Sequence, residues 1–290
     1  MIEAYLIHLL ILIGIYLILG LSLQITVGYG GILNLGHIAF FCIGAYASAL
    51  LTMNGFPFFW AIILAGMIAM VSGFLLSLPS RKLKGDYLTL VTMGFGFVIY
   101  ALALNWMSLT NGPIGIPGIP KPEIFGIIFG SNDMFLVLTI IFAAITYFCI
   151  HRITHSEFGK VLQATRDDEL SAKALGKDTF RVKAYALASS AFFAGIAGSL
   201  YAHYITYIDP TSFTIFQLIP IITIVIVAGL ASLKGTAIAT VIIVLIPESL
   251  RFVGFPSSIV GPARQMLFAL ILILILLYKP KGFFGNVELE

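Results

Sequence analysis

Long, uncharged apolar runs follow one another along most of the chain, and they exclude most folds. A helix needs roughly 20 apolar residues to cross the hydrocarbon core of a bilayer. Of the 290 residues, 60% are hydrophobic and only 10% are charged, whereas a soluble domain carries about 25% charged residues. A chain of this length cannot hide so much apolar surface in a soluble core, so the sequence predicts an integral membrane protein.

The runs are too continuous for the alternating pattern of a membrane β-barrel, so we expect an all-α, polytopic transmembrane bundle. Residues 1–290 are expected to form a single transmembrane domain, with broken or re-entrant segments. Eight to ten spans fit the pattern. We place nine, at about 4–27, 35–53, 57–79, 87–107, 134–150, 184–205, 213–232, 236–253 and 263–278.

The basic residues in the connections predict the orientation, because short cytoplasmic loops carry an excess of Lys and Arg. With the N-terminus outside, nine crossings place 13 of the 16 Lys and Arg residues in the cytoplasm. Lys121, Arg251 and Arg264 remain outside. We therefore expect an outer N-terminus and a cytoplasmic C-terminus. The first run follows no basic residue, which indicates a retained helix rather than a signal peptide.

Glycine and polar residues interrupt the pattern in GYGGILNLGHIAFFCIGAY, between the first two expected spans. Non-helical backbone at membrane depth is tolerated where it is buried in protein or lines a watery cavity, and broken helices often place polar groups on a transport path. We therefore take Gly30, Gly31, Asn34 and His37 as candidates for a translocation path. A plain cytoplasmic turn remains an alternative, as does an interhelical hydrogen bond for His37.

A second interruption, KGDYLTLVTMGFGF, opens the fourth expected span. Its aspartate can cap free N–H groups and favour the positive end of the helix dipole. The threonines and glycines that follow either allow close helix packing or face a pathway. The candidate path residues here are Asp86, Thr89, Thr92, Gly94 and Gly96.

A third irregular segment, LTNGPIGIPGIPKPEIFGIIFGSND, joins the fourth and fifth spans. Its density of Pro and Gly excludes a continuous helix. We expect an ordered outer loop or a partly inserted hairpin.

Small residues recur every four positions in the sixth expected span, as Ser190, Ala194 and Gly198. Such a face lets two helix backbones approach closely, so helix packing is the expected role, with a pore-lining role as the alternative. Glu248 and Arg251, near the outer end of the eighth span, are expected to pair.

Several kinds of chemistry have no support in the sequence. No GxxxxGK[ST] phosphate-binding loop occurs, so we expect no nucleotide site in this chain and no enzyme activity. His151 and His155 lack the glutamate of a zinc motif, and Cys42 and Cys149 lie in apolar runs, so we expect no metal, cofactor or disulfide. No nucleic-acid partner is expected. No Lys or Arg lies at the centre of a span, which weakens the case for an ion-driven carrier.

Charge is concentrated in residues 152–183, which hold 12 of the 29 Asp, Glu, Lys and Arg residues. We expect two short helices here, VLQATRDD and ELSAKALG. Gly176 would form the left-handed C-cap of the second, and Asp178 or Thr179 would cap the next span. A solvated positive-inside loop does not need an ordered helix with a small apolar face, so the pattern indicates a docking partner.

The order E-x-x-A-x-A-x-G, present as Glu169, Ala172, Ala174 and Gly176, resembles the EAA loop of ABC importer permeases. A wider resemblance, to branched-chain amino-acid permeases of the LivM type, spans nearly the whole chain. The stretches that carry it occur in the order seen in that family: GILNLGHIAFFCIGAYASALL, LKGDYLTLVTMGFGF, LTNGPIGIPGIP, SEFGKVLQATRDDELSAKALG, AGIAGSLYAHYITYIDPTSF, AGLASLKGT and YKPKGFFG.

The resemblance implies a permease subunit of an ATP-driven importer in the cytoplasmic (inner) membrane, working by alternating access. The implied partners are a second, LivH-like permease, two ATPase subunits that use ATP and Mg, an extracytoplasmic substrate-binding protein and membrane lipid. The charged loop would be a coupling helix that docks into a groove on an ATPase. Its expected residues are Arg166, Asp168, Glu169, Ala172, Ala174, Leu175 and Gly176.

Two departures from the family pattern leave the substrate open. The family often has an acidic and then a basic residue after GFGF, where this chain has the uncharged run FVIYALALNW, and its usual LTGG stands here as LTNG. Amides, urea or other amino acids are alternatives to branched-chain amino acids. A self-sufficient secondary carrier is the alternative from another class, and a membrane enzyme lacks a recognisable catalytic constellation.

Overall fold

The fold is seen in a computed structural model that describes residues 2–83, 85–124, 126–248, 257–279 and 281–285. The all-α fold class is confirmed. The α-helices are α1 (Ile2–Gln24), α2 (His37–Met53), α3 (Phe58–Ser77), α4 (Asp86–Asn105), α5 (Met107–Thr110), α6 (Asn132–His155), α7 (Glu157–Asp167), α8 (Glu169–Ala174), α9 (Thr179–Ile205), α10 (Leu218–Ala228), α11 (Leu233–Glu248) and α12 (Ser257–Tyr278).

Short irregular elements join these helices. A π-helix, η1 (Ile25–Tyr29), continues α1. The 3₁₀ turns are η2 (Leu78–Arg81), η3 (Gly112–Ile114), η4 (Pro210–Phe213) and η5 (Ile215–Gln217). The strands are β1 (Ile116–Pro117), β2 (Glu123–Ile124), β3 (Ile127–Ile128) and β4 (Tyr207–Ile208).

Six helical stretches of the described residues are long and apolar enough to cross a membrane. They are Glu3–Tyr29, Phe58–Arg81, Asp86–Asn105, Asn132–His155, Thr179–Ile205 and Val260–Tyr278. The stretches His37–Met53 and Ile215–Ala228 are apolar but shorter, and α11 has 16 residues. All of these helices overlap expected spans. The exact number of crossings stays a prediction, because the shorter helices do not match the thickness of a bilayer on their own.

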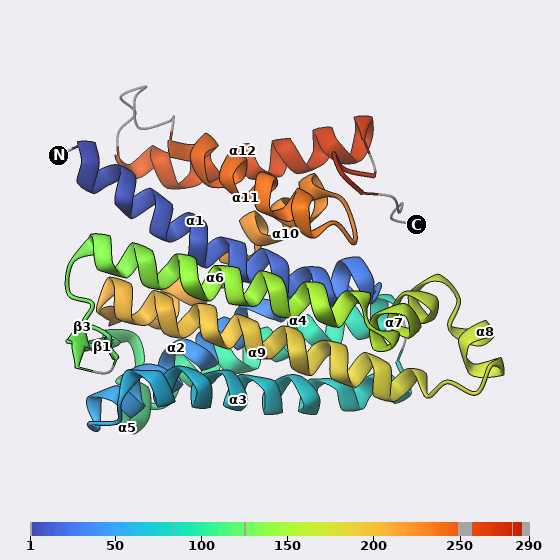
Figure 1. Cartoon of the computed structure of the whole chain (residues 1–290), viewed down its shortest axis with the longest axis horizontal. Coiled ribbons are helices and arrows are strands. Elements are labelled where there is room, and N and C mark those ends of the chain that lie inside the picture. Colours follow the sequence, from blue (N-terminus) through green and yellow to red (C-terminus); the bar gives the residue numbers. More distant parts are fainter. Residues whose placement is uncertain (1, 84, 125, 249–256, 280, 286–290) are drawn as a thin grey trace.

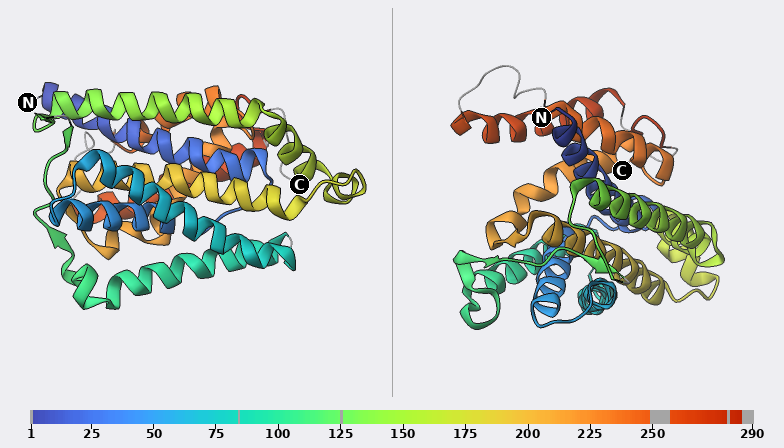
Figure 2. Two further views of the ribbon diagram at one scale, coloured as in Figure 1. Left: turned by 60° about the horizontal axis from the view of Figure 1, so that its bottom comes forward. Right: turned by 60° about the vertical axis from the view of Figure 1, so that its left-hand side comes forward.

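The long helices run roughly along one axis, and the two ends of the bundle differ (Figure 1). The helices α7 and α8 project at the end where α1 and α12 finish, whereas β1 and β3 lie at the opposite end (Figure 1). The right-hand view in Figure 2 places α4 and α12 at opposite margins of the bundle. The charged loop and the end of α12 thus share one end, as the sequence-based orientation requires.

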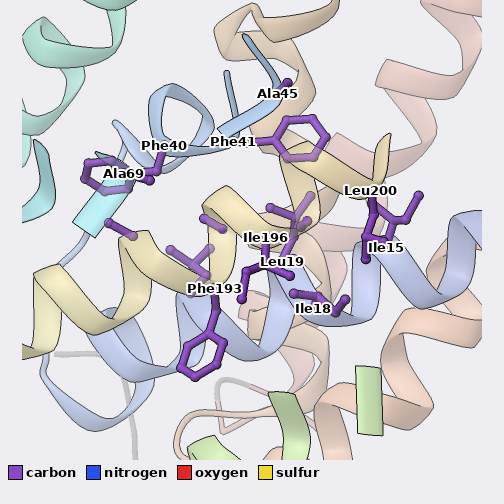
Figure 3. Packing of buried hydrophobic residues seen from close by; sticks show 14 of the residues in the cluster. Ile15, Ile18, Leu19, Phe40, Phe41, Ala45, Ala69, Phe193, Ile196 and Leu200 are labelled. Carbon is purple, nitrogen blue, oxygen red and sulfur yellow. The ribbon is translucent and has the colours of Figure 1, made fainter. Parts of the chain in front are cut away.

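Helix α9 is the centre of the packing, because 78% of an apolar 18-residue stretch of this helix is buried. Figure 3 shows its apolar side chains against those of α1 and α2, with contributions from Ile15, Ile18, Leu19, Phe40, Phe41, Phe193, Ile196 and Leu200. Small residues allow this closeness. A Cβ added to Gly198 would lie only 2.1 Å from the Phe41 carbonyl oxygen, so α2 and α9 touch backbone to backbone. Ser190 and Ala194 on the same helix are also fully buried.

The Pro/Gly-rich connection between α4 and α6 is ordered. Strand β1 pairs antiparallel with β4, with Ile116 opposite Ile208, and β2 pairs with β3. The Thr110 hydroxyl donates to the Ala103 carbonyl at 2.8 Å and closes the turn after α4. The strand pair ties the connection to the end of α9, which agrees with an ordered loop at this end of the bundle.

The chain also reverses direction inside the bundle between α10 and α11. Helix α10 has 11 residues, or about 17 Å, well short of the roughly 30 Å of a bilayer core. The fully buried Gln24 of α1 holds the turn: its amide donates to the Gly229 carbonyl and to the Thr236 hydroxyl, both at 3.0 Å, and its oxygen accepts from the Ala231 N–H at 3.1 Å. Such a satisfied amide is the expected form of a buried polar group.

Candidate functional site: the charged loop and the broken segment

Side-chain caps define the two helices of the charged loop. Ser156 accepts from the Gly159 N–H and opens α7, and Asp168 accepts from the N–H groups of Leu170 and Ser171 and opens α8. Gly176 has φ +75° and ends α8 in the left-handed conformation expected from the sequence. Asp178, rather than Thr179, caps α9 through the Arg181 N–H. Each reversal of the loop is therefore specified locally.

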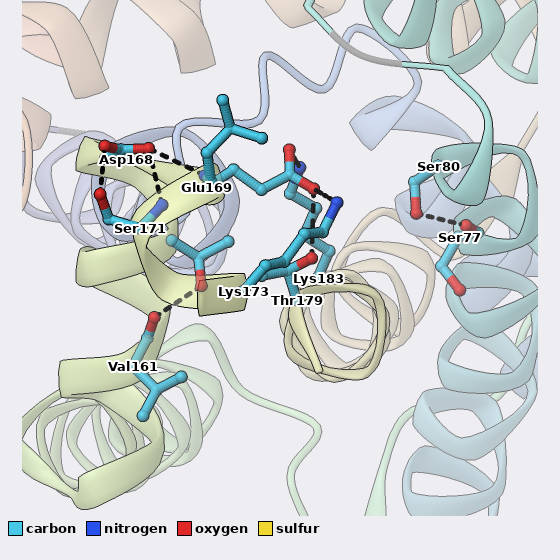
Figure 4. A network of polar contacts seen from close by, with 11 residues as sticks. Ser77, Ser80, Val161, Asp168, Glu169, Ser171, Lys173, Thr179 and Lys183 are labelled. Carbon is cyan, nitrogen blue, oxygen red and sulfur yellow. Dashed lines mark hydrogen bonds and ion pairs between the residues drawn. The ribbon is translucent and has the colours of Figure 1, made fainter. Parts of the chain in front are cut away.

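Glu169 fastens α8 to the start of α9. Its carboxylate forms ion pairs of 2.8 Å with Lys173 and Lys183, and it accepts from the Thr179 hydroxyl at 3.1 Å (Figure 4). Partial burial opposes ionisation, but the hydrogen bonds from the two lysines outweigh it and lower the pKa of Glu169 to about 2. Glu169 thus points into the body of the chain and is not available as a surface contact.

The other side of α8 is apolar and open. Ala172 is buried beneath the helix, whereas Leu170 and Leu175 are 72% and 79% exposed, and Ala174 is exposed between them. Two leucines held outward on a capped helix form a small hydrophobic projection at the end of the bundle. Such a surface suits a partner with a complementary apolar groove.

Arg166 connects the loop to the interruption after α1. Its guanidinium donates to the Gly28 carbonyl at 2.7 Å and pairs with Asp167 at 2.8 Å, and its side chain is only 11% exposed. Gly31, at φ +61°, lies so close that an added Cβ would be 2.5 Å from the Arg166 Cγ. The loop and the broken segment, far apart in sequence, therefore form one contact.

The chain between α1 and α2 turns back into the bundle. His37, the first residue of α2, places its Nε2 3.0 Å from the Ser22 hydroxyl. Ser22 lies seven residues before Tyr29, the last residue of η1, so α2 begins about 10 Å inside the end of the first helix. A plain turn at the end of two full helices is excluded. We define the non-helical stretch 30–36 as the re-entrant segment.

The re-entrant segment lies against α4, so the two candidate path segments meet. The Thr92 hydroxyl accepts from the Leu35 N–H at 3.0 Å, and a Cβ added to Gly96 would lie 3.6 Å from the Gly36 Cα. Asp86 does not cap α4: the N-cap is Gly85, which has no side chain, and Asp86 is an exposed residue of the first turn.

The remaining candidates of α4 face elsewhere. Thr89 donates weakly, at 3.4 Å, to the Gly85 carbonyl, and a Cβ added to Gly94 would meet nothing within 4 Å among the described residues. Among the described residues, the side of α4 that carries Thr92 and Gly96 therefore meets the re-entrant segment. Of the path candidates that the sequence offered on α4, these two remain.

The two faces of the re-entrant segment differ. Leu33 is 41% exposed and lines an apolar cavity of about 140 Å³ together with residues of α1, α10 and α12. Asn34 and His37 are fully buried. An open path does not reach them in this conformation, so any role in transport requires the segment to move.

A partly buried ion pair near the other end was not foreseen. Arg264 of α12 pairs with Glu248 at 2.8 Å, and the Tyr5 hydroxyl donates to the same carboxylate at 2.5 Å. The expected partner, Arg251, lies outside the described residues. The sequence held one signal for this pair, since an ionisable residue inside an apolar helix is expected to find a partner, but it did not show which partner would be near.

The contacts of the site are suited to transmitting movement from the charged loop to the interior of the bundle. The described residues contain no group of three His, Cys, Asp or Glu side chains that could hold a metal. The geometry provides an exposed apolar projection, ion pairs that hold it from behind, and a hydrogen bond to η1 directly before the re-entrant segment. With the long apolar helices, these features describe a polytopic helical membrane protein whose charged loop is attached to its interior.

Comparison with known proteins gives the particular family. Residues 5–277 match the family described as the permease component of the branched-chain amino acid transport system, and the chain belongs to that family. It is 32% identical to the high-affinity branched-chain amino acid transport system permease protein LivM of Salmonella typhimurium, over 92% of this chain and 67% of the relative.

More distant relatives support the same family. A probable LivM of Methanocaldococcus jannaschii is 27% identical, over 93% of this chain and 90% of the relative. The LivH permease of Salmonella typhimurium is 25% identical, over 95% of this chain and 92% of the relative. No solved structure matches the chain.

Proposed function

We propose that this chain is a membrane-spanning subunit of an ATP-driven importer for branched-chain amino acids. It would pair with a LivH-like permease, receive substrate from an extracytoplasmic binding protein, and take its energy from two cytoplasmic ATPase subunits that bind ATP and Mg. It would work by alternating access in the cytoplasmic membrane, with its N-terminus outside. The names of the LivM and LivH relatives support the permease pair and the substrate class.

The observation that carries the proposal is the bond between Arg166 and the Gly28 carbonyl. An ATPase that grips Leu170 and Leu175 would move α8. The ion pairs of Glu169 would carry the motion to α9, and Arg166 would carry it to the re-entrant segment. A loop that served only to join two spans would not need a bond to η1, the π-helix that leads directly into the re-entrant segment.

Affinity purification of the complete system in mild detergent tests this proposal. We expect ATPase subunits to copurify, and their ATP hydrolysis to rise when a leucine-loaded binding protein is added. Gly176→Pro forces a residue at φ +75° to a φ near −65° and is expected to abolish copurification. The matched control is Gly126→Pro, at φ +81° at the opposite end of the bundle, which is expected to keep it.

Two outcomes would contradict the proposal. Full ATPase association and transport by a correctly inserted Gly176→Pro variant would mean that the loop is not the docking element. Uptake of leucine into proteoliposomes by the purified chain alone, driven by an ion gradient, would favour a secondary carrier.

A further inference from the structure

Unpartnered polar groups meet at the buried start of α2. The Asn34 Nδ2 and the His37 Nδ1 have no hydrogen-bond partner among the described residues, although both side chains are fully buried. The N-cap of α2 is Gly36, so no side chain caps the first-turn N–H groups. A buried polar group without a partner costs about 1–3 kcal/mol, so two such side-chain atoms beside a helix start without a side-chain cap require an explanation.

The hydrogen bonds of Asn34 fix which of its atoms is free. Its Oδ1 accepts from the Gly36 N–H at 3.1 Å, which folds the side chain over the start of α2. The Nδ2 is therefore a free donor near the start of α2, where no side chain caps the first-turn N–H groups and the Ala39 N–H bonds to the Gly36 carbonyl at 2.9 Å. These donors, together with the positive end of the helix dipole, form a local environment that favours an anion.

The contacts of Ser22 bear on the tautomer of His37. The Ser22 hydroxyl has one hydrogen, and its oxygen lies 2.8 Å from the Leu19 carbonyl oxygen and 3.0 Å from the His37 Nε2. With the hydroxyl donating to Leu19, the His37 Nε2 donates to the hydroxyl. In the neutral ring the Nδ1 is then an acceptor, so the free ring nitrogen is suited to a cationic donor.

We propose that the start of α2 binds the backbone end of a zwitterionic α-amino acid. The carboxylate would accept from the Asn34 Nδ2 and the first-turn N–H groups, and the ammonium group would donate to the His37 Nδ1. Phe40 of α2 and Phe95 of α4, with ring centroids 5.6 Å apart, give the adjoining surface an apolar character that suits a branched side chain.

This inference rests on the proposed function and deepens it, because it selects among the substrates. An amide or urea has no carboxylate and gains little from the positive end of a helix. The site is closed here, and Arg166 bonds to Gly28 of η1, two residues before the re-entrant segment that carries Asn34. Movement of the charged loop would therefore open or close the site, which is what alternating access needs.

Equilibrium binding of radiolabelled L-leucine to the complete purified complex, without the binding protein, tests the site. Asn34→Asp keeps the acceptor for Gly36 and replaces only the free donor with a negative charge. We expect leucine affinity to fall at least about tenfold, while binding of leucinamide, which lacks the carboxylate, does not fall. The thermal midpoint of the variant without ligand is measured alongside, because a charge at this fully buried position also carries a desolvation cost.

The matched control is Asn54→Asp, at the exposed C-cap of the same helix, which is expected to bind leucine normally. Equal leucine affinity of Asn34→Asp and the parent chain would overturn the site and leave the importer role standing. Tighter binding of leucinamide than of leucine by the parent complex would also overturn it. Failure of ATPases to copurify would instead reject the proposed function.

Discussion

At the scale of single residues, Glu169 gives the charged loop a predictable pH dependence. Its pKa is lowered from 4.5 to about 2 in the folded chain. The ionised form therefore stabilises the attachment of α8 to the start of α9 at pH values above about 4.5. That stabilisation is lost as the pH falls from 4.5 toward 2. Hydrogen exchange of the amides at 169–178 should show constant protection from pH 7 to 5 and falling protection below.

In the variant Glu169→Gln, the protection of the amides at 169–178 should already be about tenfold lower at pH 7. The reason is that the charge-assisted bonds to the two lysines are lost. Glu157→Gln is the control, since the Glu157 carboxylate pairs only with the exposed Lys160 on the surface of α7. Unchanged protection in Glu169→Gln would show that the ion pairs do not hold α8.

Arg166 is the second residue with a testable role. Arg166→Ala removes the bond to Gly28 and should leave the ATPases attached, because the exposed leucines of α8 are untouched. We expect binding-protein-stimulated ATP hydrolysis and leucine uptake to fall about tenfold or more. Arg181→Ala, whose side chain is 74% exposed and pairs with Asp178, is the control. Normal uptake by Arg166→Ala would exclude this residue as the link.

At the scale of elements, local signals predicted what local interactions decide. The apolar runs gave the positions of the long helices, and Gly176 and Asp178 gave the ends of α8 and the start of α9, because caps depend on residues a few positions apart. The bond from Arg166 to Gly28 and the three bonds of Gln24 could not be predicted, because they join residues distant in sequence. The capping role expected of Asp86 was wrong, because the chain enters α4 through Gly85 at φ +54°.

Close contact between α2 and α9 predicts the cost of a single methyl group. Gly198→Ala would place a Cβ 2.1 Å from the Phe41 carbonyl and 2.8 Å from the Ala45 nitrogen, so the helices must separate. We expect a loss of about 1–3 kcal/mol, measured as a lower thermal midpoint in detergent. Gly94→Ala on α4 meets nothing within 4 Å in the part of the chain that the structure describes and should be neutral or slightly stabilising, since Ala favours a helix. Equal midpoints of the two variants would contradict this packing.

At the scale of the whole molecule, the two ends of the bundle should face different compartments. The charged loop lies at one end and the strand pairs at the other (Figure 1), and 13 of the 16 basic residues belong to the connections expected inside. The arrangement separates the charged loop from the strand pairs, and the count of basic residues predicts that the end with the loop faces the cytoplasm.

Cysteine labelling in a Cys149→Ser background tests this orientation, since Cys149 is exposed and Cys42 is buried. A membrane-impermeant maleimide should label Glu123→Cys in intact cells. It should label Lys177→Cys and Lys234→Cys only after permeabilisation. Labelling of Lys177→Cys in intact cells would show that the orientation is the reverse of the one predicted. Labelling of Lys234→Cys there would mean that the short helix α10 does not carry the chain inward, and the count of nine crossings would have to change.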